Sequence, residues 1–455
     1  MDLRAWTDRA VAEIAAWQRE FGEFEPHPDA VVPDGEFGAA FDALLGRLRG
    51  TYPFHHPRYL GQLIKPPHPA AVVGYLAAML LNPNNHALDG GPATTELERE
   101  AVERLAAMLG MPGALGHLTA SGTIANLESL YVARETRPGA AIAHSADAHY
   151  THARTCHLLG VRSVPIPVDA AGRIEVAALD SLLAEQDIGT VVLTAGTTGL
   201  GAVDPIHEVL ALRRRHDFRI HVDAACGGFF ALIADDAPDG VAAAPFRAIA
   251  ECDSVVVDPH KHGLQPYGCG AVLFADPSVQ RYYRHDSPWT YYTSAEPHLG
   301  EISLECSRSG AAAAALWLTL RVLPPTPGGL GRVLRAGRRA ALRWADLLAD
   351  SPVLAAYQRP ELDVLGLVPA APGMTALDER TQRVLHAGMR ADPGEAVHLA
   401  AMEVTADDLA RRGHRIAPDR PTARVLRSVL LKPEHEHWVR RCHTDLEALV
   451  RRAAE

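Results

Sequence analysis

Short runs of apolar and β-branched residues alternate with amphipathic helical segments between about Pro92 and Leu323. Such alternation is typical of strands joined by crossover helices, which form a mostly parallel sheet with helices on both faces. The central part of the chain is therefore predicted to be an α/β domain. Its expected strands are residues 140–145, 161–167, 189–196, 218–225, 253–258 and 270–275, and two of its expected helices are residues 174–186 and 207–216.

The segments on either side of this region have different patterns. Residues before about Leu81 show helical spacing, interrupted by the stretch TYPFHHPRYLGQ at 51–62, which we expect to pack against another surface. The linker PPTPGGLG leads into a segment that mixes helices and strands. A chain of 455 residues is long enough for two or three domains. We predict a helical arm over 1–85, a large domain over 86–325 and a small α+β domain over 326–455.

Charge and apolar content argue against several classes of partner. The chain has 44 basic and 55 acidic residues, and this net charge of -11 provides no basic surface for nucleic acid or anionic membrane. The longest apolar stretch, residues 69–81, is shorter than the ~20 residues that cross a bilayer. The amino terminus lacks the apolar block of a secretory signal. The six cysteines are scattered without CxxC pairs, which favours a reducing, cytoplasmic location.

Lys261 lies in the segment DSVVVDPHKHG, directly after an expected strand. The carboxyl ends of strands are where α/β folds place ligands. Burial there would favour the neutral amine, which is the form that makes Schiff bases with carbonyl groups. The alternative for an isolated lysine at the start of a loop is a solvated side chain without a chemical role.

A carboxylate, Asp223, ends a second expected strand in the segment FRIHVDAACGG. A pyridoxal phosphate (PLP) cofactor needs an acid beside its pyridine nitrogen, because the protonated ring is the better electron sink. An isolated aspartate in this place is more commonly a turn or cap residue. Since Asp223 and Lys261 each follow an apolar strand, neighbouring strands would bring both groups to one ring.

Small residues precede a helical pattern in the segment HLTASGTIANLESLYVAR. The free amide groups and the dipole at such a helix start bind phosphate, and the alternative is an ordinary serine or threonine helix cap. The chain has neither a GxxxxGK[ST] loop nor a GxGxxG after the first strand, so PLP is a better candidate for this phosphate than a nucleotide. In the segment SADAHYTHAR, His149 is a candidate to stack on the pyridine ring, and a core or surface histidine is the alternative.

The motifs TASGTIAN, DAH, HVDAA and DPHK, in this order, resemble the group II PLP-dependent amino acid decarboxylases. This fold-type-I family includes aromatic amino acid, glutamate and diaminobutyrate decarboxylases. The similarity extends from HPRYLGQ and PATTELE to VLRSVLLKP, which is nearly the whole chain. The resemblance implies a mostly parallel seven-stranded sheet, a PLP cofactor and a homodimer with the arm and residues 51–62 at its interface.

The resemblance also implies roles for individual residues. Lys261 is expected to carry the cofactor as a Schiff base, Asp223 to pair with the pyridine nitrogen, and His149 to stack on the ring. The remaining cofactor contacts implied by the family are Ser121, Gly122, Thr123, Thr198, Ala225 and His260.

The substrate side of the site is implied in the same way. Arg427 in VLRSVLLKP matches an arginine that often binds the substrate carboxylate, with a surface arginine as the alternative, and Thr95 in PATTELE matches a second substrate contact. The family's mobile loop carries a tyrosine that protonates the α-carbon, and the register of RHDSPWTYYTSAEPH leaves Tyr291 and Tyr292 as candidates. Cys226 and His262 depart from the family pattern, which commonly has an aromatic residue, or methionine in the second case, at these positions.

The expected reaction is α-decarboxylation of an L-amino acid, which releases CO2 and an amine. Transamination and oxygen-dependent conversion to an aldehyde begin from the same cofactor linkage and stay open as alternatives. A PLP-fold subunit without turnover is the alternative of another class. The segment HEHWVRRCH does not have metal-ligand spacing, because His435 and His437 point to different sides of a helix, and no metal is expected.

Overall fold

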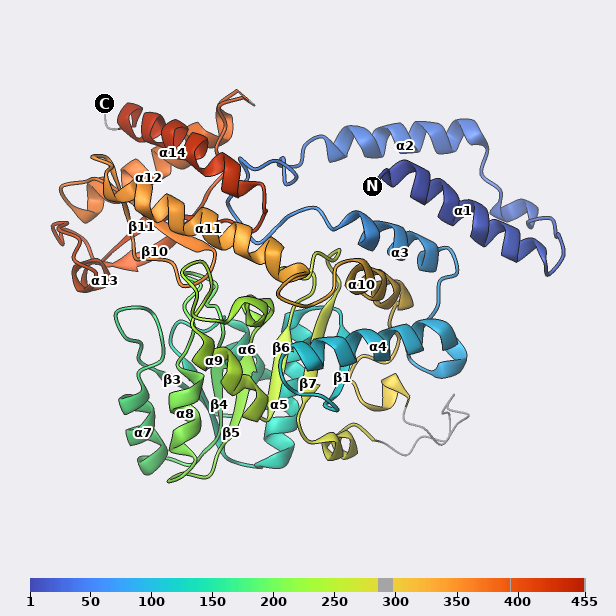
Figure 1. Cartoon of the computed structure of the whole chain (residues 1–455), viewed down its shortest axis with the longest axis horizontal. Helices are drawn as coiled ribbons and strands as arrows, with labels where there is room; N and C mark the ends of the chain where they lie inside the picture. The colour runs from blue at the N-terminus through green and yellow to red at the C-terminus, as the bar shows by residue number, and fades with distance from the viewer. Residues whose placement is uncertain (285–297, 393, 454–455) are drawn as a thin grey trace.

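The computed structural model describes residues 1–284, 298–392 and 394–453. A seven-stranded sheet with the strand order β1-β7-β6-β5-β4-β2-β3 forms its centre (Figure 1). Strands β6, β5, β4, β2 and β3 are parallel, whereas β7 is antiparallel to its neighbours β6 and β1. The prediction of a mostly parallel sheet is confirmed. The strands are β1 (Leu115–Thr119), β2 (Ala141–Ser145), β3 (Ser163–Ile166), β4 (Ile188–Thr194), β5 (Arg219–Asp223), β6 (Ser254–Val257) and β7 (Gly270–Phe274).

Helices cover both faces of this sheet, because successive strand residues point to opposite sides. Val192 and Val256 pack against the side of α5 and α6, whereas Val191 and Val255 belong to the larger core on the other face. That larger core also takes residues from α4, α7, α8, α9 and α10. The helices are α4 (Pro92–Met108), α5 (Gly122–Thr136), α6 (Thr151–Leu159), α7 (Val176–Glu185), α8 (Ile206–Leu212), α9 (Ala243–Ala248) and α10 (Gly310–Val322).

Strand β1 is absent from the strands expected from the sequence. Its residues LGHLT include Gly116 and His117 and contain no run of β-branched side chains, so local composition gives little strand signal. Pairing with β7 forms the strand, with Leu118 opposite Ala271 and Thr119 opposite Gly270. Because β1 and β6 both run antiparallel to β7, the carboxyl end of β1 lies at the same edge of the sheet as that of β6.

A smaller sheet with the order β10-β11-β9-β8 follows in the C-terminal part, where the sequence predicts a mixture of helices and strands, and its strands are antiparallel. The two faces of this sheet belong to separate hydrophobic cores. Leu426 packs in one core with Trp344 of α11, whereas Val425 packs in the other with Leu377 of α12. The elements of this C-terminal layer are α11 (Leu330–Ala349), β8 (Leu354–Ala356), β9 (Val364–Pro369), α12 (Met374–Arg390), β10 (Ala400–Thr405), α13 (Ala406–Arg411), β11 (Thr422–Val429) and α14 (His435–Arg452).

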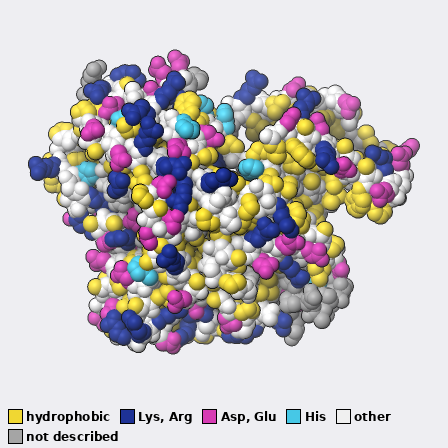
Figure 2. All heavy atoms as spheres, in the orientation of Figure 1, with side chains coloured by type: hydrophobic (Ala, Val, Ile, Leu, Met, Phe, Trp, Pro, Cys, Tyr) yellow, Lys and Arg dark blue, Asp and Glu magenta, His cyan; other side chains and the backbone are white. Residues whose placement is uncertain are grey.

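The first helices of the chain form an arm that projects from the body (Figure 1). Helices α1 (Leu3–Arg19) and α2 (Asp34–Leu48) contain no buried residue, whereas α3 (Pro69–Met79) packs closely on α10. Large apolar side chains are exposed along the arm, where Figure 2 shows hydrophobic atoms gathered. Among them are Trp6, Trp17, Phe21, Phe24, Phe37, Phe41, Leu44 and Leu48.

The aromatic stretch at 51–62 packs in part against the C-terminal layer of its own chain. The Leu60 amide donates to the carbonyl of His398, and the Val429 amide donates to the carbonyl of Leu60. Arg58 is buried and lies 2.7 Å from a carboxylate oxygen of Asp445. In the part of the chain that the structure describes, no helix combines the length and apolar character needed to cross a membrane.

Candidate active site

The carboxyl ends of the central strands meet at one edge of the large sheet. Thr194, the last residue of β4, lies opposite Asp223, the last residue of β5, and Asp223 lies opposite Val256 of β6. The chain leaves β6 through Asp258 into the turn that carries Lys261. The expectation that neighbouring strands bring Asp223 and Lys261 together is therefore confirmed by the strand order.

A cavity of about 230 Å³ opens at this edge. All the residues that the sequence assigns to the cofactor line it, together with several that the sequence did not single out. The lining residues are Ser121, Gly122, Thr123, Asn126, His149, Tyr150, Thr151, Thr194, Gly196, Thr198, Asp223, Ala225, Cys226, Asp258, His260 and Lys261.

The amine of Lys261 is held inside the cavity by two neighbours. Its Nζ lies 3.0 Å from Oδ2 of Asp258 and donates to Sγ of Cys226 at 3.4 Å. Burial by itself lowers the pKa of Lys261, but Cys226, Asp258 and Asp223 together raise it above the usual lysine value. The expectation that burial leaves a neutral amine is therefore wrong for this arrangement of charges, because the nearby acidic groups outweigh burial.

Asp223 is buried and bonded to a histidine that the sequence analysis missed. Nε2 of His152, in the first turn of α6, lies 2.9 Å from Oδ2 of Asp223, and the Ala225 amide donates to Oδ1. Burial by itself raises the pKa of Asp223, but the hydrogen bond and charge of His152, with the charge of Lys261, bring it well below its usual range. The carboxylate is thus ionised, as a partner of a protonated pyridine nitrogen must be.

The start of α5 forms another wall of the cavity. Oγ of Ser121 accepts from the Ile124 amide, so this serine is a helix cap and a cavity residue at once. A Cβ atom at Gly122 would lie 2.6 Å from Oδ2 of Asp258, which leaves no room for a side chain. The first amides of α5 therefore remain close to the cavity, where the helix dipole favours an anion.

Two histidines line the cavity as predicted. His149 follows β2, and burial lowers its pKa, which favours the neutral ring. Nδ1 of His260 lies 2.8 Å from the carbonyl oxygen of Cys269, and its ring packs on Tyr267 with centroids 4.7 Å apart. The His260 ring is therefore held by its neighbours, and Nδ1 of His149 accepts from the Thr151 amide at 3.3 Å.

The residues expected to bind substrate lie outside the cavity lining. The guanidinium of Arg427 is buried behind the loop after β4 and donates to the carbonyls of Thr198, Gly199 and Gly61. Thr95 is fully buried in α4, and its hydroxyl has no hydrogen-bond partner among the described residues. Tyr291 and Tyr292 lie outside the residues that the structure describes.

The residues present fit PLP. A lysine amine, an ionised carboxylate and the start of a helix line one cavity, and each matches one part of the cofactor: its aldehyde carbon, its ring nitrogen and its phosphate. The close approach of Gly122 to Asp258 leaves no room for a side chain at this one residue of the helix start. The residues that sequence reasoning missed, His152 and Asp258, each carry a weak signal: His152 follows His149 by one helical turn, and Asp258 directly follows the strand before the lysine.

Comparison with known proteins gives concordant results. A family model described as the pyridoxal-dependent decarboxylase conserved domain matches residues 52–351. An L-tyrosine decarboxylase of Enterococcus faecium is 29% identical over 420 residues, which cover 70% of this chain and 69% of that protein. A probable L-aspartate decarboxylase of Halobacterium salinarum is 34% identical over 275 residues, or 60% of this chain and 73% of that protein. A crystal structure of mouse CSAD has the same fold, with a TM-score of 0.79 at 19% identity and 98% of each chain covered.

Proposed function

This chain belongs to the pyridoxal-dependent decarboxylase family and is an amino acid decarboxylase that uses PLP, and we propose that it removes the α-carboxylate of an L-amino acid in the cavity described above. The family, fold class, cofactor and reaction class expected from the sequence motifs are confirmed. The observation that carries the proposal is the convergence of Lys261, Asp223, His149 and the start of α5 on one cavity. When bound, PLP accepts the electron pair left on the α-carbon after a bond there breaks.

Each of these groups has a proposed task. Lys261 holds the cofactor, and Asp258, 3.0 Å from its amine, keeps that amine in place. Asp223 keeps a proton on the ring nitrogen, because His152 holds this carboxylate in its ionised form. The first amides of α5 bind the phosphate, with Ser121, Gly122, Thr123, Thr198 and His260 around it. His149 and Ala225 bound the ring.

We propose that Arg427 binds the substrate carboxylate. Its side chain is buried, and among the described residues its guanidinium bonds only to carbonyl oxygens, with no carboxylate within ion-pair distance. A buried cation without a counter-ion is costly, so an incoming carboxylate is favoured there. Arg427 would fix the orientation of the substrate carboxylate, and PLP would supply the electron sink that favours its loss as CO2. Thr95 is retained as a proposed second contact.

The substrates to test first are L-tyrosine and L-aspartate, since these amino acids appear in the names of the related proteins. Product analysis separates the reaction from its alternatives. CO2 with an amine supports decarboxylation, a keto acid indicates transamination, and an aldehyde with oxygen consumption indicates the oxidative route. Tyr291 and Tyr292 are the proposed proton donors, one of which returns a proton to the α-carbon.

The arm supports a homodimer. Helices α1 and α2 expose a series of large apolar side chains and bury none of their residues in this chain, so a second copy is the proposed cover for them.

The proposed division of the chain is arm 1–85, cofactor domain 86–325 and C-terminal domain 326–455. All six cysteines are free thiols, which supports a reducing, cytoplasmic location.

Substitution of the lysine tests the assignment of the cavity. We expect Lys261→Ala to abolish CO2 release and the long-wavelength absorbance of the purified holoenzyme. The matched control is Lys432→Met, because that amine bonds the Tyr59 carbonyl and does not line the cavity. Reduction of the wild-type holoenzyme with borohydride, followed by peptide mapping, should place the pyridoxyl group on residue 261. Unchanged colour in Lys261→Ala, or a label on another lysine, would contradict the assignment.

A further inference from the structure

The turn that carries Lys261 is held on both sides by histidines. His260, before the lysine, contacts the carbonyl of Cys269 in the large sheet's own layer. His262, after the lysine, reaches in the other direction: its Nε2 lies 2.8 Å from Oδ2 of Asp363, which belongs to the C-terminal layer. The side chain that departs from the family pattern therefore makes the contact between the lysine turn and the other layer.

The contact between His262 and Asp363 is buried. The side chains are 3% and 4% exposed, and the edge of Phe230 packs on the histidine ring with centroids 4.9 Å apart. Burial by itself raises the pKa of Asp363, but the charge and hydrogen bond of His262, and the charge of Lys65, lower it below its usual value. Removal of the histidine would leave an ionised carboxylate buried without this donor, which is costly.

Asp363 is also tied to the strand that carries Arg427. It directly precedes β9, and its carbonyl accepts from the amide of Leu430, just after β11 ends. The paired strands place Val364 opposite Val429 and Gly366 opposite Arg427. The path from Lys261 to Arg427 thus consists of one backbone step to His262, one buried hydrogen bond and one strand pairing.

We infer that His262 is a positioning residue, whose hydrogen bond to Asp363 keeps the lysine turn at a fixed separation from the strand that carries Arg427. The inference rests on the proposed roles of Lys261 and Arg427. A bound substrate must meet both groups at once, so a small change in their separation misplaces the α-carbon relative to the ring. His262 acts through its neighbours and touches neither cofactor nor substrate in this assignment.

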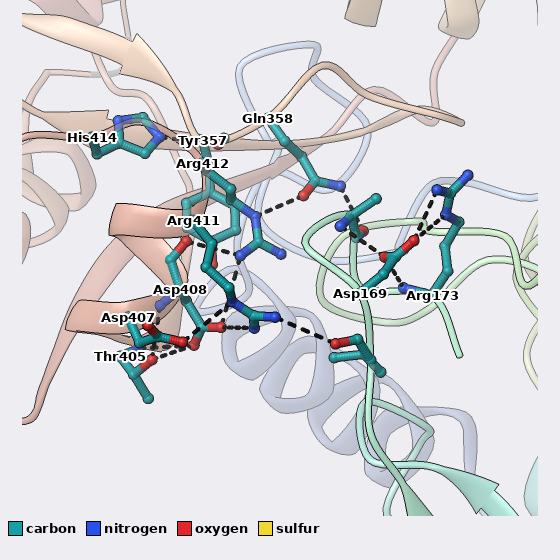
Figure 3. Close-up of polar contacts among 12 residues, drawn as sticks. Asp169, Arg173, Tyr357, Gln358, Thr405, Asp407, Asp408, Arg411, Arg412 and His414 are labelled. Atoms are coloured by element: carbon teal, nitrogen blue, oxygen red, sulfur yellow. Dashed lines mark hydrogen bonds and ion pairs between the residues drawn. The ribbon is translucent and has the colours of Figure 1, made fainter. Parts of the chain in front are cut away.

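A contact between the same layers that does not reach the lysine turn provides the matched control. The side chain of Gln358 donates to the Ala171 carbonyl at 3.0 Å and accepts from Arg412 at 2.9 Å (Figure 3). Loss of Gln358 removes one hydrogen bond between the layers, to Ala171, and one within the C-terminal layer, to Arg412, and it leaves the contact of His262 untouched. If the substitutions act by loosening the two layers in general, kcat falls in both the His262 and the Gln358 variants. If the role of His262 is local, kcat falls only in the His262 variant.

The experiment compares His262→Leu, His262→Gln and Gln358→Leu with the wild-type holoenzyme. We expect His262→Leu to lower kcat by about tenfold to hundredfold at full PLP content, which corresponds to loss of one hydrogen bond to a charged group. His262→Gln retains a donor and should recover most of this loss, whereas Gln358→Leu should keep kcat within about twofold. If His262→Leu gives no soluble protein, His262→Asn replaces it, because its shorter side chain cannot reach Asp363.

Hydrogen exchange measured by mass spectrometry gives a readout that does not depend on turnover. We expect faster exchange in the peptide that spans residues 254–268 in His262→Leu, and no change there in Gln358→Leu. Unchanged exchange in this peptide, or equal loss of kcat in both variants, would overturn the inference. A wild-type protein that releases no CO2 would refute the proposed function instead, and the exchange data would still decide whether His262 fixes the turn.

Discussion

Replacement of His152 by leucine tests how the acid beside the cofactor is kept ionised. In the structure, Nε2 of His152 lies 2.9 Å from Oδ2 of Asp223, and the two side chains are 0% and 7% exposed. Burial by itself raises the pKa of Asp223, and the hydrogen bond and charge of His152 reverse that effect. The substitution removes the main group that lowers the pKa and leaves the burial that raises it.

The size of the effect follows from the strength of that contact. A hydrogen bond to a charged group contributes about 1.5 to 3 kcal/mol, and one pKa unit corresponds to about 1.4 kcal/mol. The pKa of Asp223 should therefore rise by about one to two units in His152→Leu. A carboxylate whose pKa is lowered by folding stabilises the protein above its unfolded pKa, and this contribution is lost as the pH falls through the folded pKa. The variant should accordingly be less stable than the wild type at neutral pH, and its stability should begin to fall at a higher pH on the acid side.

The assay is thermal unfolding of the holoenzyme as a function of pH. The control is His144→Leu, because His144 is also buried near this layer but contacts Ser145 and Ser163 and not Asp223. We expect the loss of thermal stability on the acid side to begin at a higher pH in His152→Leu only, because Asp223 then takes up its proton at a higher pH. Coincident acid-side stability profiles in His152→Leu and wild type would refute the reasoning about Asp223.

Three further predictions concern the start of α5, Arg427 and the arm. Gly122→Ala should weaken PLP binding by about 1 to 3 kcal/mol, measured by fluorescence titration, because the new Cβ meets a carboxylate oxygen at 2.6 Å; unchanged affinity would contradict the tight approach. Arg427→Lys should raise KM by about tenfold or more at unchanged PLP affinity, because lysine lacks the planar fork that binds a carboxylate; a wild-type KM would assign the carboxylate to another group. Trp17→Asp with Phe41→Asp should halve the mass measured by light scattering, since both side chains are about half exposed on the arm. Leu158→Asp, which changes an exposed residue of α6, should leave that mass unchanged.

Much of the candidate site could be predicted from the sequence because its groups follow strand ends. Lys261 and Asp223 each come after an apolar run, so their common edge follows from a parallel sheet. Ser121 was found by the helical pattern that it precedes. His152 and Asp258 were missed, because neither a second histidine in a helix nor an aspartate before a proline is distinctive by itself. Their importance lies in distances across the fold, 2.9 Å to Asp223 and 3.0 Å to Lys261.

The charge state of Lys261 shows where local reasoning fails. A lysine after a strand is expected to lose its proton when buried, and that expectation considers burial alone. The structure places Cys226, Asp258 and Asp223 around the amine, and together they raise its pKa. Whether burial or the neighbouring charges dominate the pKa of Lys261 depends on side chains that come from separate segments of the chain. A motif of a few residues does not contain that information.

The sequence by itself determined the α/β alternation, the cofactor motifs and the family, because periodicity and short motifs are local properties of the chain. Only the tertiary structure decided which strands are neighbours, that β1 exists, and that His262 meets Asp363 across two layers. These features arise from pairing and packing between segments far apart in the chain. The energy of such contacts depends on distance and burial in space, and residue order alone specifies neither.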